Sequence, residues 1–276
     1  MFILRPVNKS LFAAPHRADT VEANQASVER AIRHMKQRLA EPLELDELAR
    51  IAAISKFHLV RVFDEVTGTT PAHFLSCLRM QRAKELMLGS ETSITDICME
   101  VGYASLGSFS KTFNTLVGVS PQEFRGLPKR LTPLQFAKAV WRYLATDQKI
   151  TGPKVEGVVE GPRGPQGFTF VGVFTGGVPQ GAPFSGTVML KRGGFCLARP
   201  DAAEFHLLAA LIPFSADLTA IVATLPVGLV ASQRVQNTGA KNLEVPSLRL
   251  RPLRVTDPPI VLALPALPPW RGTFTK

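Results

Sequence analysis

An internal repeat with an offset of 50 residues constrains the fold of this chain more than any other feature of its sequence. Polar, apolar, glycine and proline positions all recur, in the pairs Ser55 and Ser105, Leu59 and Phe109, Arg61 and Lys111, Phe63 and Phe113, Gly68 and Gly118, Pro71 and Pro121, and Phe74 and Phe124. Agreement across such different residue types predicts one supersecondary unit that is built twice.

Each repeat predicts a helix, a tight turn and a second helix. Ser55 and Ser105 can cap the second helix of their units, because a serine side chain accepts hydrogen bonds from the free backbone N–H groups at a helix start. Gly68 and Gly118 can end that helix, since glycine adopts the left-handed conformation of a C-cap.

A long helix is expected between the two units, from Pro71 to about Leu88. At 1.5 Å per residue it would be a strut of roughly 27 Å. A further helix ahead of the first unit is indicated by apolar residues at helical spacing, namely Val28, Ile32, Met35 and Leu39.

Two helix-turn-helix units on one side of a DNA duplex fit successive major grooves when they lie one helical turn, ~34 Å, apart. The strut is compatible with that separation. The helical period leaves exposed, on the second helix of each unit, Lys56, His58, Val60, Arg61 and Asp64, and Leu106, Gly107, Ser108, Ser110 and Lys111. An arginine such as Arg61 can donate two hydrogen bonds to guanine, and Val60 can contact a thymine methyl group.

The segment 28–130 resembles the DNA-binding domain of the AraC/XylS family of bacterial transcription regulators. The resemblance lies in LELDELARIAAISKFHLVRVFDEVTGTTPAHFLSCLRMQRAKELM (43–87) and SITDICMEVGYASLGSFSKTFNTLVGVSPQEFR (93–125). It implies a module that binds in two major grooves of double-stranded promoter DNA and either activates or inhibits transcription by RNA polymerase.

By position, the resemblance implies DNA contacts from Phe57, Val60, Arg61, Leu106, Gly107, Ser110 and Lys111. Leu106 and Gly107 depart from the family pattern, in which these side chains are usually polar. The second unit is therefore expected to contribute mainly phosphate and shape contacts. The full predicted DNA-binding set is Ser55, Lys56, Phe57, His58, Val60, Arg61, Ser105, Leu106, Gly107, Ser108, Ser110 and Lys111.

The composition changes near residue 150, because residues 151–276 hold 15 of the 21 glycines and 15 of the 22 prolines. Short β-branched and aromatic runs between these turns favour a small antiparallel sandwich. The expected architecture is multidomain, an all-α twin helix-turn-helix domain followed by an all-β sandwich-like domain. Its parts are an N-terminal arm (1–27), the DNA-binding domain (28–130), a linker helix (131–152) and the β domain (153–276). Most members of the AraC/XylS family have the DNA-binding unit at the C-terminal end of the chain.

Charge and composition limit the partners and the compartment. The chain has 32 Lys and Arg against 22 Asp and Glu, a formal net charge of +10, which suits a polyanionic partner. No apolar run approaches the roughly 18 residues that a membrane helix needs. Three widely spaced cysteines form neither a disulfide pattern nor a metal site, so we expect a cytoplasmic protein without metal or cofactor.

The role of the β domain is open at this point. It can sense a small-molecule effector, dimerise or contact another protein. One alternative makes it the active part, a carbohydrate- or peptide-binding module that the helices tether to DNA. Another is an enzyme fused to a DNA-binding module, as in alkyl-transfer repair, which requires an activated cysteine. Cys196 is expected to lie buried in an apolar strand, so we expect no enzymatic activity.

Overall fold

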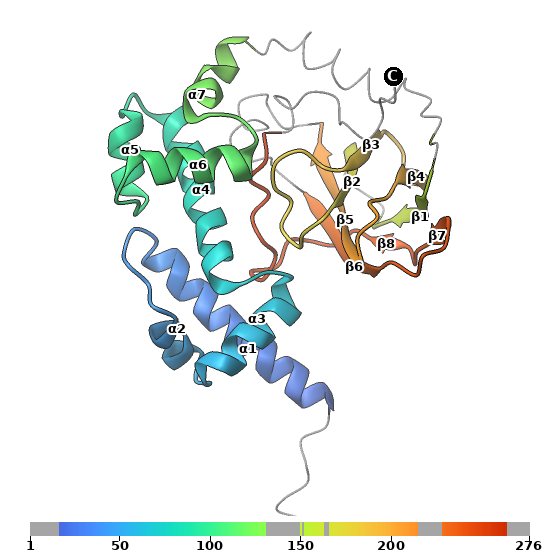
Figure 1. Cartoon of the computed structure of the whole chain (residues 1–276), viewed down its shortest axis with the longest axis horizontal. Helices are drawn as coiled ribbons and strands as arrows, with labels where there is room; N and C mark the ends of the chain where they lie inside the picture. The colour runs from blue at the N-terminus through green and yellow to red at the C-terminus, as the bar shows by residue number, and fades with distance from the viewer. Residues whose placement is uncertain (1–16, 131–149, 151, 163–165, 215–227, 264–276) are drawn as a thin grey trace, which may run out of the picture.

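A computed structural model describes residues 17–130, 150, 152–162, 166–214 and 228–263. The helices come first in the chain and the strands follow (Figure 1). The helices are α1 (Arg17–Gln37), α2 (Leu45–Ala52), α3 (Lys56–Thr67), α4 (Pro71–Gly89), α5 (Ile94–Glu100), α6 (Leu106–Val117) and α7 (Pro121–Arg130). The strands are β1 (Lys154–Glu160), β2 (Gly167–Phe174), β3 (Ser185–Met189), β4 (Gly194–Ala198), β5 (Glu204–Pro213), β6 (Leu229–Gln236), β7 (Asn242–Glu244) and β8 (Leu248–Arg249).

The two repeats fold into matching helix-turn-helix units, α2–α3 and α5–α6. The predicted caps are confirmed. The Ser55 hydroxyl accepts a hydrogen bond from the His58 backbone N–H, and the Ser105 hydroxyl accepts one from the Ser108 backbone N–H. Gly68 and Gly118 end α3 and α6 with φ angles of 74° and 94°, in the left-handed region that favours glycine.

Helix α1 begins at Arg17, so it takes in eleven residues that the sequence assigns to an N-terminal arm. The reason is that residues 20–26 are exposed or half-buried and carry no apolar period from which a helix could be predicted. The buried face begins at Ser27 and Val28, as the pattern indicates. Residues 1–16 lie outside the described part.

Each unit has its own apolar core, and α4 belongs to both. Phe74, Leu75 and Leu78 of α4 pack with the first unit. Met80 and Met87 of the same helix pack with the second unit. The expected strut between the units is therefore confirmed as a 19-residue helix whose two ends are buried in different cores.

The strands form two four-stranded sheets. The first has the order β4-β1-β7, with β8 also paired to β1, and the second has the order β3-β2-β5-β6. The second sheet is antiparallel throughout, but β1 pairs in parallel with β7 and β8, so the expectation of a purely antiparallel β half is wrong for the first sheet. Both sheets contribute to one apolar cluster, for example through Val155 and Leu197 of the first and Val171 and Leu207 of the second.

Residues 255–263, here called the C-terminal strap, run between the helical half and the sheets (Figure 1). The side chains of the strap alternate. Val261 and Ala263 are buried in the core of the second unit, whereas Leu262 packs on Phe170 and Phe174 on the other face of the second sheet. The halves are therefore packed into one body by the strap. The predicted linker helix at 131–152 lies almost entirely outside the described residues.

Candidate nucleic-acid interface

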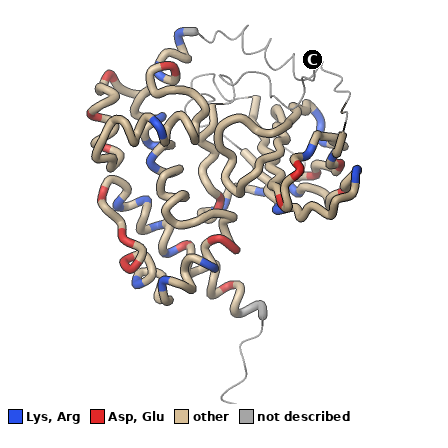
Figure 2. The backbone as a smooth tube through the Cα atoms, viewed as in Figure 1, with Lys and Arg blue, Asp and Glu red and all other residues tan. Residues whose placement is uncertain are grey.

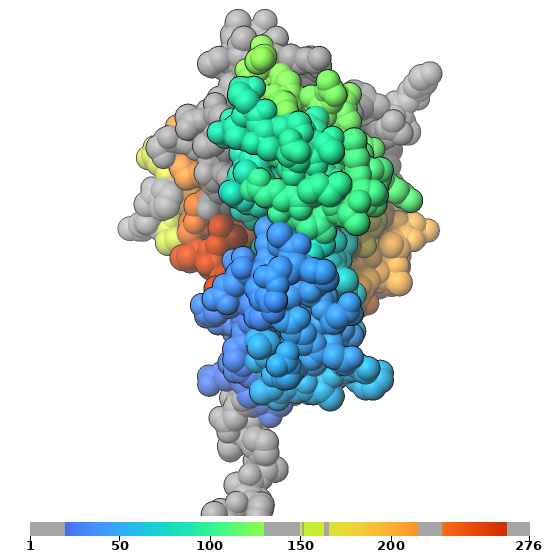
Figure 3. Space-filling model, turned by 90° about the vertical axis from the view of Figure 1, so that its left-hand side faces the viewer, coloured from blue at the N-terminus to red at the C-terminus, as the bar shows by residue number. Residues whose placement is uncertain are grey.

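The second helices of the two units, α3 and α6, are here called the reading helices. In Figure 1 both run from the outer side of the helical half toward the strands. Their C-terminal ends meet the same loop between β2 and β3. The Gly181 N–H donates to the Leu116 carbonyl over 3.0 Å, and a Cβ added to Gly177 would lie only 1.9 Å from the Gly68 carbonyl oxygen. Their N-terminal ends therefore point away from the strands, toward the side seen in Figure 3.

The first reading helix has one buried and one exposed face. Leu59 and Phe63 are buried in the core of the first unit. Phe57 is 80% exposed and Val60 36% exposed, and Arg61 lies on the same face as Val60. The resemblance assigns Phe57 to the DNA contacts, and the structure places its side chain on the surface.

Arg61 is held along the helix surface in the absence of DNA. Its guanidinium lies 2.8 Å from Glu65 and 3.1 Å from Nδ1 of His58. The His58 ring in turn contacts Asn24 of α1 at 3.3 Å. Lys56 pairs with Asp46 at 3.3 Å. Because exposed ion pairs contribute about 0–1 kcal/mol, these partners can be exchanged for DNA groups at small cost.

The second reading helix presents a flatter and less polar surface. Leu106 is 41% exposed, and a Cβ added to Gly107 would meet nothing within 4 Å. The Ser105 and Ser108 hydroxyls lie 2.9 Å apart and are occupied with capping the helix. Lys111 is exposed and has no ion-pair partner among the residues that the structure describes. Ser110 is half-buried.

The sequence gives no local signal for a contact between the first reading helix and the strands. Arg234 of β6 pairs with Asp64 of α3 at 3.1 Å, across a separation of 170 residues in the chain. Only the folded arrangement brings these two side chains together. Figure 2 shows Lys and Arg positions interleaved with Asp and Glu positions along the backbone of the helical half.

A buried lysine joins the strap to the second unit. Lys84 of α4 is 1% exposed, donates a hydrogen bond to the Val261 carbonyl at 3.0 Å and lies 5.4 Å from the ring centroid of Phe124. Burial lowers the pKa of Lys84 to about 7. The helical pattern places Lys84 on α4, but it does not predict that a segment from the other end of the chain covers this residue.

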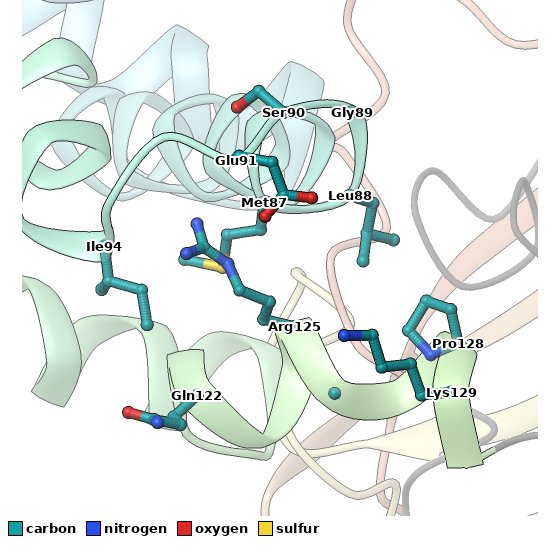
Figure 4. A pocket seen from close by; sticks show the side chains of 11 residues that line it. Met87, Leu88, Gly89, Ser90, Glu91, Ile94, Gln122, Arg125, Pro128 and Lys129 are labelled. Carbon is teal, nitrogen blue, oxygen red and sulfur yellow. The ribbon is translucent and has the colours of Figure 1, made fainter.

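A cavity of about 690 Å³ lies where the end of α4 faces α7. Figure 4 shows Arg125 reaching into it between Glu91 and Met87. Arg125 donates to the Thr92 carbonyl at 2.5 Å, which ties α7 to the loop before α5. The position of Arg125 indicates a structural role inside the second unit.

The described residues contain no group of three or more His, Cys, Asp or Glu that could hold a metal ion, and none of their helices is long and apolar enough to cross a membrane. The expected burial of Cys196 is wrong, because Phe195 and Leu197 face the core and the strand alternation turns Cys196 outward. Desolvation and the neighbouring Glu156 carboxylate, 3.3 Å away, raise the pKa of the Cys196 thiol, which disfavours the nucleophilic thiolate.

Comparison with known proteins locates the similarity in the helical half. Residues 48–126 match a family described as a helix-turn-helix domain. The chain is 34% identical over 92 residues to the MmsAB operon regulatory protein of Pseudomonas aeruginosa, a match that covers 33% of this chain and 30% of that protein. It is 30% identical over 116 residues to the HTH-type transcriptional regulator GbdR of the same species, covering 40% and 32%. The chain thus spans about a third of the length of these curated relatives.

Among solved structures, an AraC-type transcriptional regulator from Chromobacterium violaceum is 29% identical and has a TM-score of 0.38. The match covers 41% of this chain and 98% of that one.

Proposed function

We propose that this chain, whose residues 48–126 are an AraC-type helix-turn-helix domain, binds double-stranded promoter DNA sequence-specifically and regulates transcription. In this proposal α3 and α6 enter successive major grooves on one side of the duplex. The DNA lies in the cytoplasm, and RNA polymerase is the further partner on which regulation acts.

One observation carries this proposal. Both reading helices bury one face in a core of their own and leave the predicted contact face open to solvent. The β2–β3 loop contacts the C-terminal ends of these helices and leaves the N-terminal ends free. In helix-turn-helix proteins the N-terminal residues of the recognition helix contact the base edges, so the free ends are the ones that base contact requires.

The predicted residues divide by chemistry. Arg61 can form a bidentate contact with guanine, and Val60 and Phe57 can make apolar contacts with thymine methyl groups. In the second unit Lys111 supplies a charge for a phosphate, and Gly107 allows the backbone to come close to the DNA. The first unit then provides most of the base specificity, and the second provides affinity and register.

For the β half we propose a sandwich-like domain that controls the reading helices through ligand sensing or protein contact. Its strap and its β2–β3 loop touch the second unit, and the loop also touches the end of α3. A ligand or protein that favours one arrangement of the β half would therefore act directly on the spacing of α3 and α6.

Selection from a random DNA library with the full-length chain tests the proposed function. We expect enrichment of a site with two half-sites about 10 base pairs apart. In a footprinting experiment the bound protein should protect the same face of the duplex at both half-sites. Arg61→Ala should alter the selected sequence, whereas Arg249→Ala, on the solvent-facing side of β8, should not. Failure of the library to enrich any sequence would overturn the proposal.

A further inference from the structure

The two reading helices carry few positive charges for a DNA-binding surface. Helix α3 has Lys56 and Arg61 but also Asp64 and Glu65, so its net charge is zero. Helix α6 has Lys111 as its one charged residue. Because each phosphate contact needs a cationic or hydrogen-bonding group, a cation that another element places beside these helices would strengthen the binding of DNA.

Arg234 of β6 is such a cation. Its guanidinium lies 3.1 Å from the Asp64 carboxylate. Asp64 follows Val60 by four residues and Arg61 by three, so the three side chains lie on one face of α3. The Arg234 guanidinium is therefore beside the face that is predicted to enter the major groove.

Solvent reaches the ion pairs that hold Arg234, which are with Asp64 and, at 4.0 Å, with Glu204 of β5. The Arg234 side chain is 40% exposed, and β6 is the edge strand of its sheet. A cleft of about 530 Å³ opens between the end of α3 and β6, and it is also lined by Arg254, an exposed residue whose side chain has no ion-pair partner in the described ranges. Figure 1 shows β6 at the border of the strand half that faces α3.

We propose that β6 is part of the DNA-binding surface and that Arg234 contacts the phosphate backbone beside the first reading helix. The proposal rests on the proposed function of α3 and α6. In the free protein Arg234 neutralises Asp64, a carboxylate that would otherwise repel the duplex. In the complex the same guanidinium reaches a phosphate at the edge of the groove, so the β half holds DNA directly.

The rival explanation is that the ion pair only fastens the two halves of the protein together. The two explanations predict different outcomes for substitutions that break the same contact. If the pair only fastens the two halves, Arg234→Gln causes no further loss of DNA affinity once Asp64→Asn has broken the pair. If Arg234 contacts DNA, Arg234→Gln weakens binding in the Asp64→Asn background as well, because a phosphate contact is lost.

The experiment measures binding of the full-length variants to the duplex selected by the wild-type chain, as a function of salt concentration. Arg234→Gln is also made in the Asp64→Asn background, where the pair with Asp64 is already absent and Glu204 of β5, 4.0 Å from the guanidinium, is the carboxylate that remains beside it. We expect it to lower the slope of log affinity against log salt by about one in that background, as loss of one phosphate contact does. Arg234→Lys should keep the slope, because it keeps the charge.

Arg249→Ala is the matched control, since Arg249 is 83% exposed on β8 and pairs with Glu160, away from α3. It should leave the slope unchanged. An unchanged slope for Arg234→Gln in the Asp64→Asn background, with all variants folded by circular dichroism, would overturn the assignment of Arg234 to the DNA surface. Absence of any selected duplex would instead refute the proposed function itself, so the two failures are distinguishable.

Discussion

The Lys84 ammonium group donates a hydrogen bond to the Val261 carbonyl over 3.0 Å, in a site where the lysine side chain is almost completely buried. This contact joins the middle of the helical half to the end of the described chain. It also places an ionisable group at the junction between the strap and the second helix-turn-helix unit. The attachment of the strap should therefore depend on pH.

Lys84 should make a contribution to the stability of the protein that rises with pH above neutrality. Its pKa is about 7 in the folded protein and near 10.5 in the unfolded chain, so between these values the unfolded state binds more protons. Each pH unit in that window should add up to about 1.4 kcal/mol to the free energy of unfolding, and acidification toward pH 7 should remove it.

Urea unfolding between pH 7 and 10 measures this dependence. Lys84→Met should flatten the pH profile, since methionine fills a similar volume without a titratable group. The matched control is Lys111→Met on the surface of α6, which should leave the profile as in the wild type. Equal slopes for wild type and Lys84→Met would show that Lys84 does not carry the effect.

The helical half was largely predictable from sequence because its signals are local. The capping residues lie directly at the ends of the helices that they cap, as Ser55 and Gly68 do for α3. The repeat supplies each of these signals a second time, in Ser105 and Gly118. The sequence does not predict the start of α1, because residues 20–26 carry no apolar period.

The strand half and its attachment were predictable only in part. The glycine and proline turns indicated short strands, but the parallel pairs of β1 join residues about 90 positions apart, as in Val155 with Leu243. The burial of Val261 among helices, and the pairing of Asp64 with Arg234, depend on similarly distant segments. No local pattern encodes such contacts. The DNA contacts of the predicted set stay predictions.

Arg61→Ala should reduce specific DNA binding by about 1–3 kcal/mol and relax the preference at one base pair. The cause is loss of the bidentate contact that a guanidinium makes with guanine. Selection of bound sequences with the variant, beside titrations on single-base variants of the site, measures both effects. Glu65→Gln is the control, because it removes the partner of Arg61 and keeps the guanidinium. Uniform weakening on all sequences by Arg61→Ala would contradict base recognition by this residue.

Lys111→Ala should act differently from Arg61→Ala. Lys111 is expected to contact a phosphate, so its removal should weaken binding to all sequences alike and lower the salt slope by about one. The selected base preferences should stay as in the wild type. A changed base preference at a single base pair would instead assign Lys111 to base recognition. The second helix-turn-helix unit would then contribute to sequence specificity.

Gly177→Ala should disturb the placement of both reading helices. A Cβ at this position would lie 1.9 Å from the Gly68 carbonyl oxygen, closer than real side chains come, so the β2–β3 loop or the end of α3 must move. Such overpacking typically costs about 1–3 kcal/mol of folding stability. The same loop holds the Leu116 carbonyl at the end of α6 through Gly181, so the shift should also weaken binding to a site with two half-sites.

The neighbouring Gly176→Ala is a stringent control for this prediction, because a Cβ there would meet nothing within 4 Å. It adds the same methyl group to the same loop, and it should leave unfolding and DNA binding close to the wild type. Binding should be compared on the full site and on a single half-site for α3. If the loop sets the spacing of the reading helices, Gly177→Ala loses more affinity on the full site than on the half-site. Equal losses on the two duplexes would mean that the loop supports stability alone and does not position α6 relative to α3.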